Sequence, residues 1–212
     1  MNDKGEIVCT LGPIESGGIK VSLPRKNRKY TYADYLSWSE DERVEIIDGD
    51  PYLLASPSRI HQKVLSELHR QIANFLVGKE CEVYPAPFHV VLDLEGNVSN
   101  EEDIQNVFEP DITIVCDTSK LDDAGCKGTP DMIVEVISPS TARRDKIVKF
   151  NKYEQAGVKE YWIIEPQEKI VSVFTLEENR RYGRPNLYTN EDQVKVTIFD
   201  DLIIDLKMVL SE

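Results

Sequence analysis

The chain has 212 residues, a formal net charge of −13 at pH 7 and 41% hydrophobic residues. This length suits one domain that buries a full core without disulfides. Proteins that grip duplex DNA over many phosphates usually present a basic face, so the charge disfavours tight non-specific DNA binding. Because net charge is a sum over the chain, it does not exclude a local basic patch. Some of the acidic residues could also form a carboxylate cluster that binds a metal ion.

Several sequence features bear on the compartment. No apolar run approaches the length of a membrane span, and the first residues, 1–6, lack the apolar stretch of a signal peptide. The cysteines, which form no C-x-x-C pair, are Cys9, Cys81, Cys116 and Cys126. This spacing argues against a zinc ribbon or a redox motif and favours a reducing, intracellular setting. We therefore expect a soluble cytoplasmic protein that contacts no membrane.

Residues 1–30 show weak periodicity and are interpreted as an N-terminal arm. The most basic stretch of the chain lies here and comprises Lys20, Arg25, Lys26, Arg28 and Lys29. Two explanations stay open for it, a solvated tail or an arm that contacts phosphate or wraps around a second copy of the chain. The remainder, 31–212, has no internal repeat and no clear linker, which predicts a single domain.

The first part of this domain shows clear local signals. Thr31 is a suitable N-cap for a short helix over 32–38. Two short apolar runs within 43–54 meet at Asp48-Gly49, a dipeptide that supplies the positive φ angles of a hairpin turn. A long amphipathic helix follows over 59–76, with its apolar face formed by Val64, Leu65, Leu68, Ile72, Phe75 and Leu76.

Short strand patterns and polar connectors alternate in the middle of the chain. The patterns at 81–85 and 88–93 indicate a second strand pair. An acidic stretch over 94–108 and a polar stretch over 117–130 are expected to be connectors. Between these connectors, 111–115 is expected to form an apolar strand.

A strand, a helix and a second strand are predicted next, at 132–137, 141–155 and 159–165, with Gly157 as the helix stop. This order implies a right-handed βαβ unit with parallel neighbouring strands. Further strands are expected at 170–176, 182–188 and 194–199, and 201–210 is expected to pack on the core.

Two of the predicted strands carry an acid. Asp111 begins one apolar run, and Glu135 lies inside another. A buried strand has no structural use for a carboxylate, because desolvating a charge is costly unless it is paired or bound to metal. Hydrolysis of a phosphodiester uses Mg²⁺ or Mn²⁺ held by carboxylates to neutralise the developing charge. The two acids on neighbouring strands therefore predict a divalent-metal site in a nuclease core.

The helix after the Glu135 strand carries a candidate lysine. Asp145, Lys149 and Tyr153 recur at i, i+4 and i+8, so they share one helix face. On spacing alone, a surface ion pair between Asp145 and Lys149, worth about 0.5 kcal/mol or less, is the simpler interpretation. The alternative is that the helix places Lys149 over the end of the strand, where its charge stabilises a phosphate.

Glu45 and His61 each have two interpretations from the residues alone. Strict alternation places Glu45 opposite Val44 and Ile46, so it either faces solvent or serves as a further acid at the site. His61 stands at the start of a helix, where a capping or packing role is commoner than metal ligation. His69 and His89 have no acids at ligand spacing, and no role is assigned to them.

The order of these motifs resembles the Uma-type family of restriction-endonuclease-like proteins, in the PD-(D/E)xK nuclease superfamily. The matching stretches cover about 30–205 and comprise Val44 to Gly49, Ser56 to Ser58 before His61-Gln62, Glu109 to Asp111, Val134 to Ser140, Asp145 with Lys149 and Tyr153, and Gly157 to Ile164. Each stretch is short, but their order and spacing together are fairly specific.

The resemblance implies an α/β restriction-endonuclease-like core, with a central mixed β-sheet flanked by α-helices, in a homodimer that acts on DNA with Mg²⁺ or Mn²⁺. By position, Asp111 and Glu135 match the two metal-binding acids, and Glu45 matches an additional upstream acid that supports the metal. The superfamily's lysine two residues after the second acid is absent, because Ile137 stands there. In this family the lysine is expected on the following helix, as Lys149.

Three functions remain open from the sequence. The first is a metal-dependent endonuclease that hydrolyses phosphodiester bonds in DNA, with Glu45, Asp111, Glu135 and Lys149 as catalytic residues. The second is a catalytically inactive nuclease-fold protein that binds or scaffolds, which the acidic balance favours. The third is a metal-dependent hydrolase of RNA or of another phosphate ester.

Overall fold

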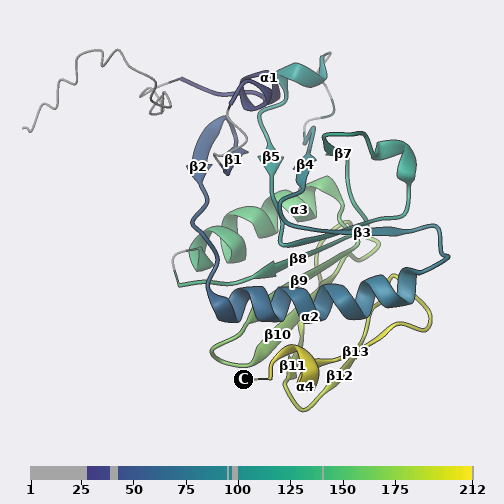
Figure 1. Ribbon diagram of the computed structural model, residues 1–212. Helices are drawn as coiled ribbons and strands as arrows, with labels where there is room; N and C mark the ends of the chain where they lie inside the picture. The colour runs from purple at the N-terminus through teal and green to yellow at the C-terminus, as the bar shows by residue number, and fades with distance from the viewer. Residues whose placement is uncertain (1–27, 39–42, 95, 97–99, 140, 212) are drawn as a thin grey trace, which may run out of the picture.

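Two mixed β-sheets with helices around them form the computed structural model, which describes residues 28–38, 43–94, 96, 100–139 and 141–211. A six-stranded sheet has the order β11-β10-β9-β8-β6-β3, and a five-stranded sheet has the order β2-β1-β5-β4-β7. Figure 1 shows the five-stranded sheet in the upper half of the view, above β8 and β9. This arrangement confirms the prediction of a mixed α/β fold, but it has two main sheets where one was expected.

The six-stranded sheet is the centre of the fold. Its strands are β3 (Glu82–Pro85), β6 (Ile112–Val115), β8 (Met132–Val136), β9 (Glu160–Glu165), β10 (Ile170–Thr175) and β11 (Asn186–Thr189). β8 and β9 are parallel, as the predicted βαβ unit requires, and every other neighbouring pair in this sheet is antiparallel. All five residues of β8 are buried, because helices cover both faces of the sheet there.

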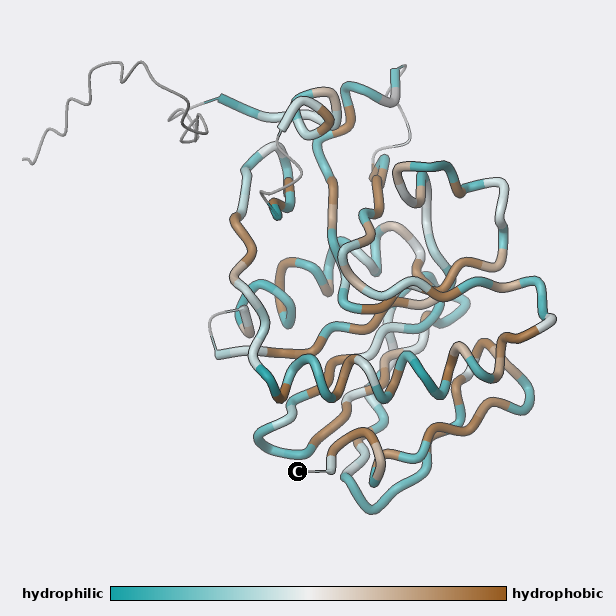
Figure 2. Tube along the Cα trace, viewed as in Figure 1, coloured by the Kyte–Doolittle hydropathy of each residue, from teal (hydrophilic) through white to brown (hydrophobic). Residues whose placement is uncertain are grey.

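Helix α2 (Arg59–Leu76) covers one face of this sheet. It begins at the N-cap Ser58, whose hydroxyl accepts a hydrogen bond from the amide of His61 at 3.2 Å. Its predicted apolar side packs against alternate residues of the strands, including Met132, Val134 and Trp162. In Figure 2 the tube of α2 alternates between brown and teal, as expected for a helix with one apolar side.

The helix after β8 covers the opposite face. It starts with a π-helical segment, Arg144–Lys149, and continues as α3 (Phe150–Ala156). It ends at Gly157, whose φ of 89° is the left-handed conformation expected for a C-terminal stop. Tyr153 packs here with Ile133 and Ile163, so residues 133 and 163 face α3 while their neighbours in sequence face α2.

The five-stranded sheet contains β1 (Val44–Ile47), β2 (Asp50–Leu53), β4 (His89–Val91), β5 (Val107–Phe108) and β7 (Gly125–Lys127). The predicted hairpin is confirmed, since β1 and β2 pair through Asp48 and Gly49, both with positive φ. Helix α1 (Tyr32–Leu36), with Thr31 as N-cap, packs at this sheet together with Val91 and Val107. Short 3₁₀ turns lie at Glu101–Asp103 and Thr118–Lys120.

The C-terminal residues form a small layer against α2. β12 (Gln193–Lys195) and β13 (Ile203–Asp205) pair with each other, and α4 (Leu206–Val209) follows. Gln71 of α2 accepts a hydrogen bond from the amide of Asp205 at 2.9 Å. The expectation that 201–210 packs on the core is therefore confirmed.

Three strand predictions need correction. The stretches near 81–85 and 88–93 form strands, but they do not pair with each other, because β3 joins the six-stranded sheet and β4 joins the five-stranded one. The connectors contain β5 and β7, each too short to show a periodicity. The strands expected at 182–188 and 194–199 are shorter and shifted, as β11 and β12.

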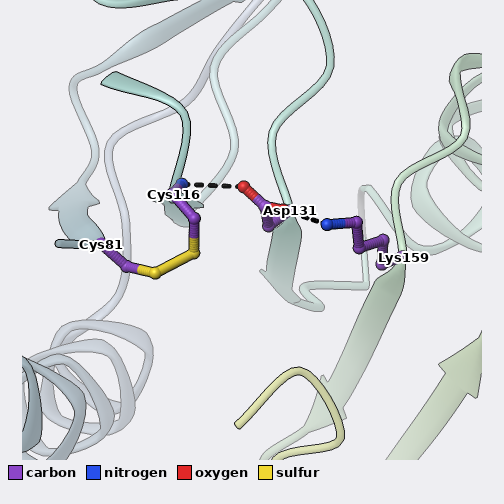
Figure 3. The surroundings of a disulfide bond; sticks show 4 residues. All are labelled: Cys81, Cys116, Asp131 and Lys159. Carbon is purple, nitrogen blue, oxygen red and sulfur yellow. Dashed lines mark hydrogen bonds and ion pairs between the residues drawn. A yellow bond between two sulfur atoms is a disulfide. The ribbon is translucent and has the colours of Figure 1, made fainter. Parts of the chain in front are cut away.

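The cysteines behave differently from the expectation. Cys81 and Cys116 form a disulfide across the ends of β3 and β6 (Figure 3). Among the described cysteines, Cys126 is free and buried. Asp131 accepts a hydrogen bond from the amide of Cys116 at 2.7 Å and forms an ion pair with Lys159 at 2.6 Å. Disulfides persist mainly in oxidising compartments, so this bond disagrees with the reducing setting that the cysteine spacing indicates. The spacing did not reveal it, because β-sheet pairing brings together two cysteines that are 35 residues apart in sequence.

The N-terminal arm and the search for a membrane-spanning helix both depend on which residues the structure describes. The arm, 1–30, lies mostly outside the described residues, as do Cys9, Lys20, Arg25 and Lys26, so the division into an arm and a domain over 31–212 stays a prediction. At its end, Lys29 forms an ion pair with Asp50 at 2.9 Å. Within the described ranges, no helix combines the length and the apolar character needed to cross a membrane.

Candidate active site

Asp111 and Glu135 lie side by side at the end of two paired strands. β6 and β8 are antiparallel with Ile112 opposite Val134, so the next pair along the register is Asp111 and Glu135. Opposed residues point to the same face, here the face that α3 covers. A carboxylate oxygen of Asp111 accepts a hydrogen bond from the amide of Val136 at 2.7 Å, which fixes the acid against β8.

Lys149 lies at the centre of a buried cluster of acids. Its Nζ is 2.6 Å from Glu45 Oε1, 2.8 Å from Glu135 Oε1 and 3.6 Å from Asp145 Oδ1. The lysine side chain is only 3% exposed. The interpretation of Asp145 and Lys149 as a surface pair is therefore wrong. The helix after β8 instead swings the lysine over Glu135.

Glu45 reaches the cluster from the other sheet. It is 0% exposed, so of the two alternatives left open by the sequence, the one in which it faces solvent is wrong. All four residues of β1 are buried, because both sides of this strand are covered. Its Oε1 accepts a hydrogen bond from the amide of Glu109 at 3.1 Å. Its Oε2 finds no hydrogen-bond partner in the part of the chain that the structure describes, and it lies 3.7 Å from Nε of Arg144.

Further side chains surround the cluster. The hydroxyl of Tyr153 donates to Glu135 Oε1 at 2.9 Å, so Glu135 is held by two donors from one helix face. Nε2 of His61, at the start of α2, lies 3.1 Å from Asp111 Oδ1. Nε of Arg43 donates to Glu109 at 2.6 Å.

The electrostatics show an excess of negative charge. Burial raises the pKa of Glu135 well above its usual value. The positive charge of Lys149 lowers this pKa in part, and the negative charges of Asp145, Asp111 and Glu45 raise it further. Burial also raises the pKa values of Asp145 and Glu109. Burial opposes the charged form of Lys149, but the surrounding carboxylates outweigh it and raise the pKa of the lysine. The lysine therefore stays charged.

An open cavity of about 310 Å³ gives access to this cluster. Asp111, Glu135 and Lys149 line it, together with His61 and Arg144, whereas Glu45 lies behind Lys149 and is not among the lining residues. Around the cavity, five acids face three cations: Glu45, Glu109, Asp111, Glu135 and Asp145 against Arg43, Arg144 and Lys149. Among the described residues, two negative charges are left without a cation when all these acids are ionised.

The residues fit a magnesium-type ion held by two carboxylates. Among the described residues, no group of three or more His, Cys, Asp or Glu side chains is arranged to hold an ion by itself. Mg²⁺ does not need such a cage, because it keeps several waters and is commonly held by one or two carboxylates plus phosphate oxygens. Asp111 and Glu135 supply two carboxylates, and the excess charge of the cavity matches a divalent cation.

Comparison with known proteins fits this arrangement. A family model, Uma2, described as "Putative restriction endonuclease", matches residues 32–207. The chain belongs to the Uma2 family. The resemblance seen in the sequence motifs is thus confirmed.

Relatives of this Uma2 chain come from cyanobacteria. The uncharacterized protein slr1290 of Synechocystis is 31% identical over 127 residues, which is 59% of this chain and 62% of that protein. The uncharacterized protein sll1609 of the same organism is 27% identical over 140 residues, 64% of this chain and 74% of that protein. The chain thus matches less than two thirds of slr1290.

A solved structure shares the fold. The crystal structure of a putative nuclease belonging to DUF820 from Anabaena variabilis superposes with a TM-score of 0.68. The match covers 85% of this chain and 97% of that one at 17% identity, so it supports the architecture alone.

The structure of this Uma2 chain brings the four predicted site residues into one region. Glu45, Glu135 and Lys149 touch directly, and Asp111 lies beside Glu135. Arg144 and the contact of His61 with Asp111 were missed, although the position of His61 ahead of a helix was noticed. No role is assigned to His69, and His89 lines a second cavity.

Proposed function

We propose that this chain is a metal-dependent endonuclease that hydrolyses phosphodiester bonds in DNA on a restriction-endonuclease-like core. The observation that carries the proposal is the buried lysine held by Glu45 and Glu135 beside Asp111 on the wall of an open cavity. Burying a charged cluster brings little stability, which supports a chemical reason for it. Membership of the Uma2 family adds to this support.

Each residue then has a role. Asp111 and Glu135 would hold Mg²⁺ or Mn²⁺, which when bound supplies charge neutralisation and an activated water. Lys149 presents its ammonium to the scissile phosphate and keeps its charge among the acids. Arg144 lines the cavity, and its Nε makes no hydrogen bond to the described residues and lies 3.7 Å from Glu45 Oε2, so it is a second cation for phosphate.

Two residues act through others. Tyr153 donates to Glu135 and fixes the orientation of its carboxylate. Glu45 was expected to support the metal, but it is buried behind Lys149, and this burial favours a role in positioning the lysine. A homodimer, which the family resemblance implies, is part of the proposal and is tested by light scattering after gel filtration.

Isothermal titration of Mn²⁺ tests the metal site first, with and without a short DNA oligonucleotide. Wild type should bind saturably, and Asp111→Ala should lose binding while Asp201→Ala, a change of an exposed acid, keeps it. Plasmid and single-stranded DNA then test cleavage. Wild type that binds no Mn²⁺ in either condition, or cleaves nothing, would favour the inactive binding or scaffold function. Cleavage of RNA or of a small phosphate ester alone would favour another hydrolase.

A further inference from the structure

A second cavity, of about 330 Å³, lies next to the candidate active site. Four of its described lining residues carry aromatic rings, Tyr35, Tyr84, Phe88 and His89. Two exposed acids, Asp122 and Asp123, also line it. We call it the aromatic cavity. Its rings come from α1, from β3, from the segment after β3 and from β4, so separate parts of the chain build it.

The rings are packed against one another. Tyr84 and Phe88 stack with centroids 4.2 Å apart and an angle of 6° between planes. Tyr35 meets His89 edge-on at 5.2 Å, and Nε2 of His89 lies 3.3 Å from the hydroxyl of Tyr32. These contacts hold the rings in place before any ligand arrives, which lowers the entropy cost of binding.

The acidic side of the cavity is also ordered. β7 runs parallel to β4 with Gly125 opposite His89, and a Cβ on Gly125 would stand 2.4 Å from the carbonyl oxygen of His89. Only glycine allows this approach. Asp122 accepts hydrogen bonds from the amides of Ala124 at 2.8 Å and Gly125 at 3.0 Å, which fixes the loop that carries Asp123.

The chemistry of the lining favours a flat ring with N–H groups on its edge. Aromatic side chains offer stacking surfaces, and ionised carboxylates only accept hydrogen bonds. None of the described residues that line the aromatic cavity is Lys or Arg, so its lining offers a phosphate no lysine or arginine cation. A nucleobase has both features, a π-face and exocyclic or ring N–H donors.

The two cavities are neighbours. Glu109 lines both of them, and the adjacent residues Ala86 and Pro87 line the first and the second, respectively. A strand whose phosphate lies at Lys149 therefore brings a neighbouring base next to the aromatic cavity. A base in an intact duplex is paired and stacked, so it has to leave the stack to enter.

We propose that the aromatic cavity binds an unstacked nucleobase, and that the substrate is consequently single-stranded or locally unpaired nucleic acid. This inference rests on the proposed function and narrows its substrate. It also agrees with the net charge of −13, because stacking gives affinity without a long row of phosphate contacts.

Binding measured without cleavage tests the inference. Fluorescence anisotropy in EDTA compares a labelled single-stranded oligonucleotide, the same strand as a duplex, and the same strand with abasic sites. Wild type should prefer the single strand with bases. Tyr84→Ala should weaken that binding about 5- to 150-fold, the range expected for one stacked base, and should bind the abasic strand like wild type. Tyr188→Ala, a half-buried tyrosine on β11, is the matched control.

A second variant covers the case in which loss of a ring disturbs folding. Asp123→Ala removes only an exposed side chain and should lower the preference for the single strand with bases over the abasic strand. Thermal unfolding checks each variant. A preference for the strand with bases that is unchanged in folded Tyr84→Ala and Asp123→Ala would overturn the inference.

The remaining outcomes separate the inference from the proposed function. If Tyr84→Ala cleaves duplex DNA as fast as wild type, the nuclease function is retained and the aromatic cavity is not a base site. A protein that never cleaves, but binds single strands through Tyr84, loses the nuclease function and keeps the base site. Aromatic rings with acids also suit organic cations, so a trimethyl-lysine peptide is tested in parallel. Binding of that peptide without binding of the oligonucleotide would overturn the inference.

Discussion

The two faces of the six-stranded sheet differ at β8, where one face buries apolar side chains and the other also buries an ionic cluster. Toward α2, β8 places Met132, Val134 and Val136, and that face is filled by apolar side chains from α2 and the C-terminal layer. Toward α3, the same strand places Ile133 and then Glu135, which meets Lys149 and Tyr153. One strand therefore serves as ordinary core on one side and as the wall of an ionic cluster on the other.

The difference separates stability from chemistry. Burying apolar surface on the α2 face contributes about 25 cal/mol per Å² removed from water. On the α3 face, the attraction within the ionic cluster is largely offset by the loss of solvation, so a buried ion pair is weak support for stability. Single changes on the two faces should therefore have different consequences for folding and for cleavage.

The largest effect is expected from Lys149→Met. The change leaves Glu45, Glu135 and Asp145 buried without their shared cation, and breaking a buried pair in this way costs about 3–5 kcal/mol. The free energy of unfolding from urea titration measures the loss, and cleavage should be abolished. Adding Glu135→Gln should recover part of the stability without cleavage, whereas a Lys149→Met protein as stable as wild type would contradict the interpretation of the cluster.

On the opposite face, Leu68→Ala should cost a comparable amount of stability and leave the chemistry intact. Leu68 is 0% exposed on α2, and removing its side chain loses burial and leaves a void, at about 2–4 kcal/mol. The urea midpoint should fall, while the cleavage rate per folded molecule stays within about twofold of wild type. A strong loss of rate in fully folded protein would show that the α2 face also controls the active site, through His61 at the start of α2.

A smaller change in stability is expected from Glu135→Gln. The amide oxygen still accepts from Lys149 and Tyr153, and Lys149 keeps Glu45 and Asp145, so the free energy of unfolding should change by about 1 kcal/mol or less. Wild type should gain about 2.7 kcal/mol at an Mn²⁺ concentration 100 times its Kd, and the variant should gain nothing. Equal stabilisation of both proteins by Mn²⁺ would remove Glu135 from the metal site.

The α2 face was predictable from the sequence, and the α3 face only in part. Local patterns were sufficient for the hairpin at Asp48-Gly49, for α2 and for the strand–helix–strand unit around Lys149. Such patterns depend on neighbours within a few residues. The helical spacing of Asp145 and Lys149 showed that they share a side, but not that this side is buried.

What the sequence did not reveal depends on distant pairing. The alternation of side chains along a strand predicts that Glu45 lies on the opposite side of β1 from Val44 and Ile46. That this side is buried could not be predicted, because it depends on the helix after β8, whose Lys149 packs there. The separation of β3 and β4 into different sheets, and the bond between Cys81 and Cys116, likewise follow from partners far along the chain. The aromatic cavity had no linear motif, because its rings come from separate segments.

The smallest effect is expected from Lys146→Ala, which lies on the same helical segment as Lys149 but outside the cluster. Nζ of Lys146 is 2.6 Å from Glu165 Oε1, and the two side chains are 41% and 22% exposed. An exposed pair of this kind contributes about 0.5 kcal/mol or less, because water and salt screen it. The free energy of unfolding and the cleavage rate should therefore stay close to wild type. If Lys146→Ala lowered cleavage as much as Lys149→Met, the site would depend on the total positive charge of the helix, and not on one ammonium held between Glu45 and Glu135.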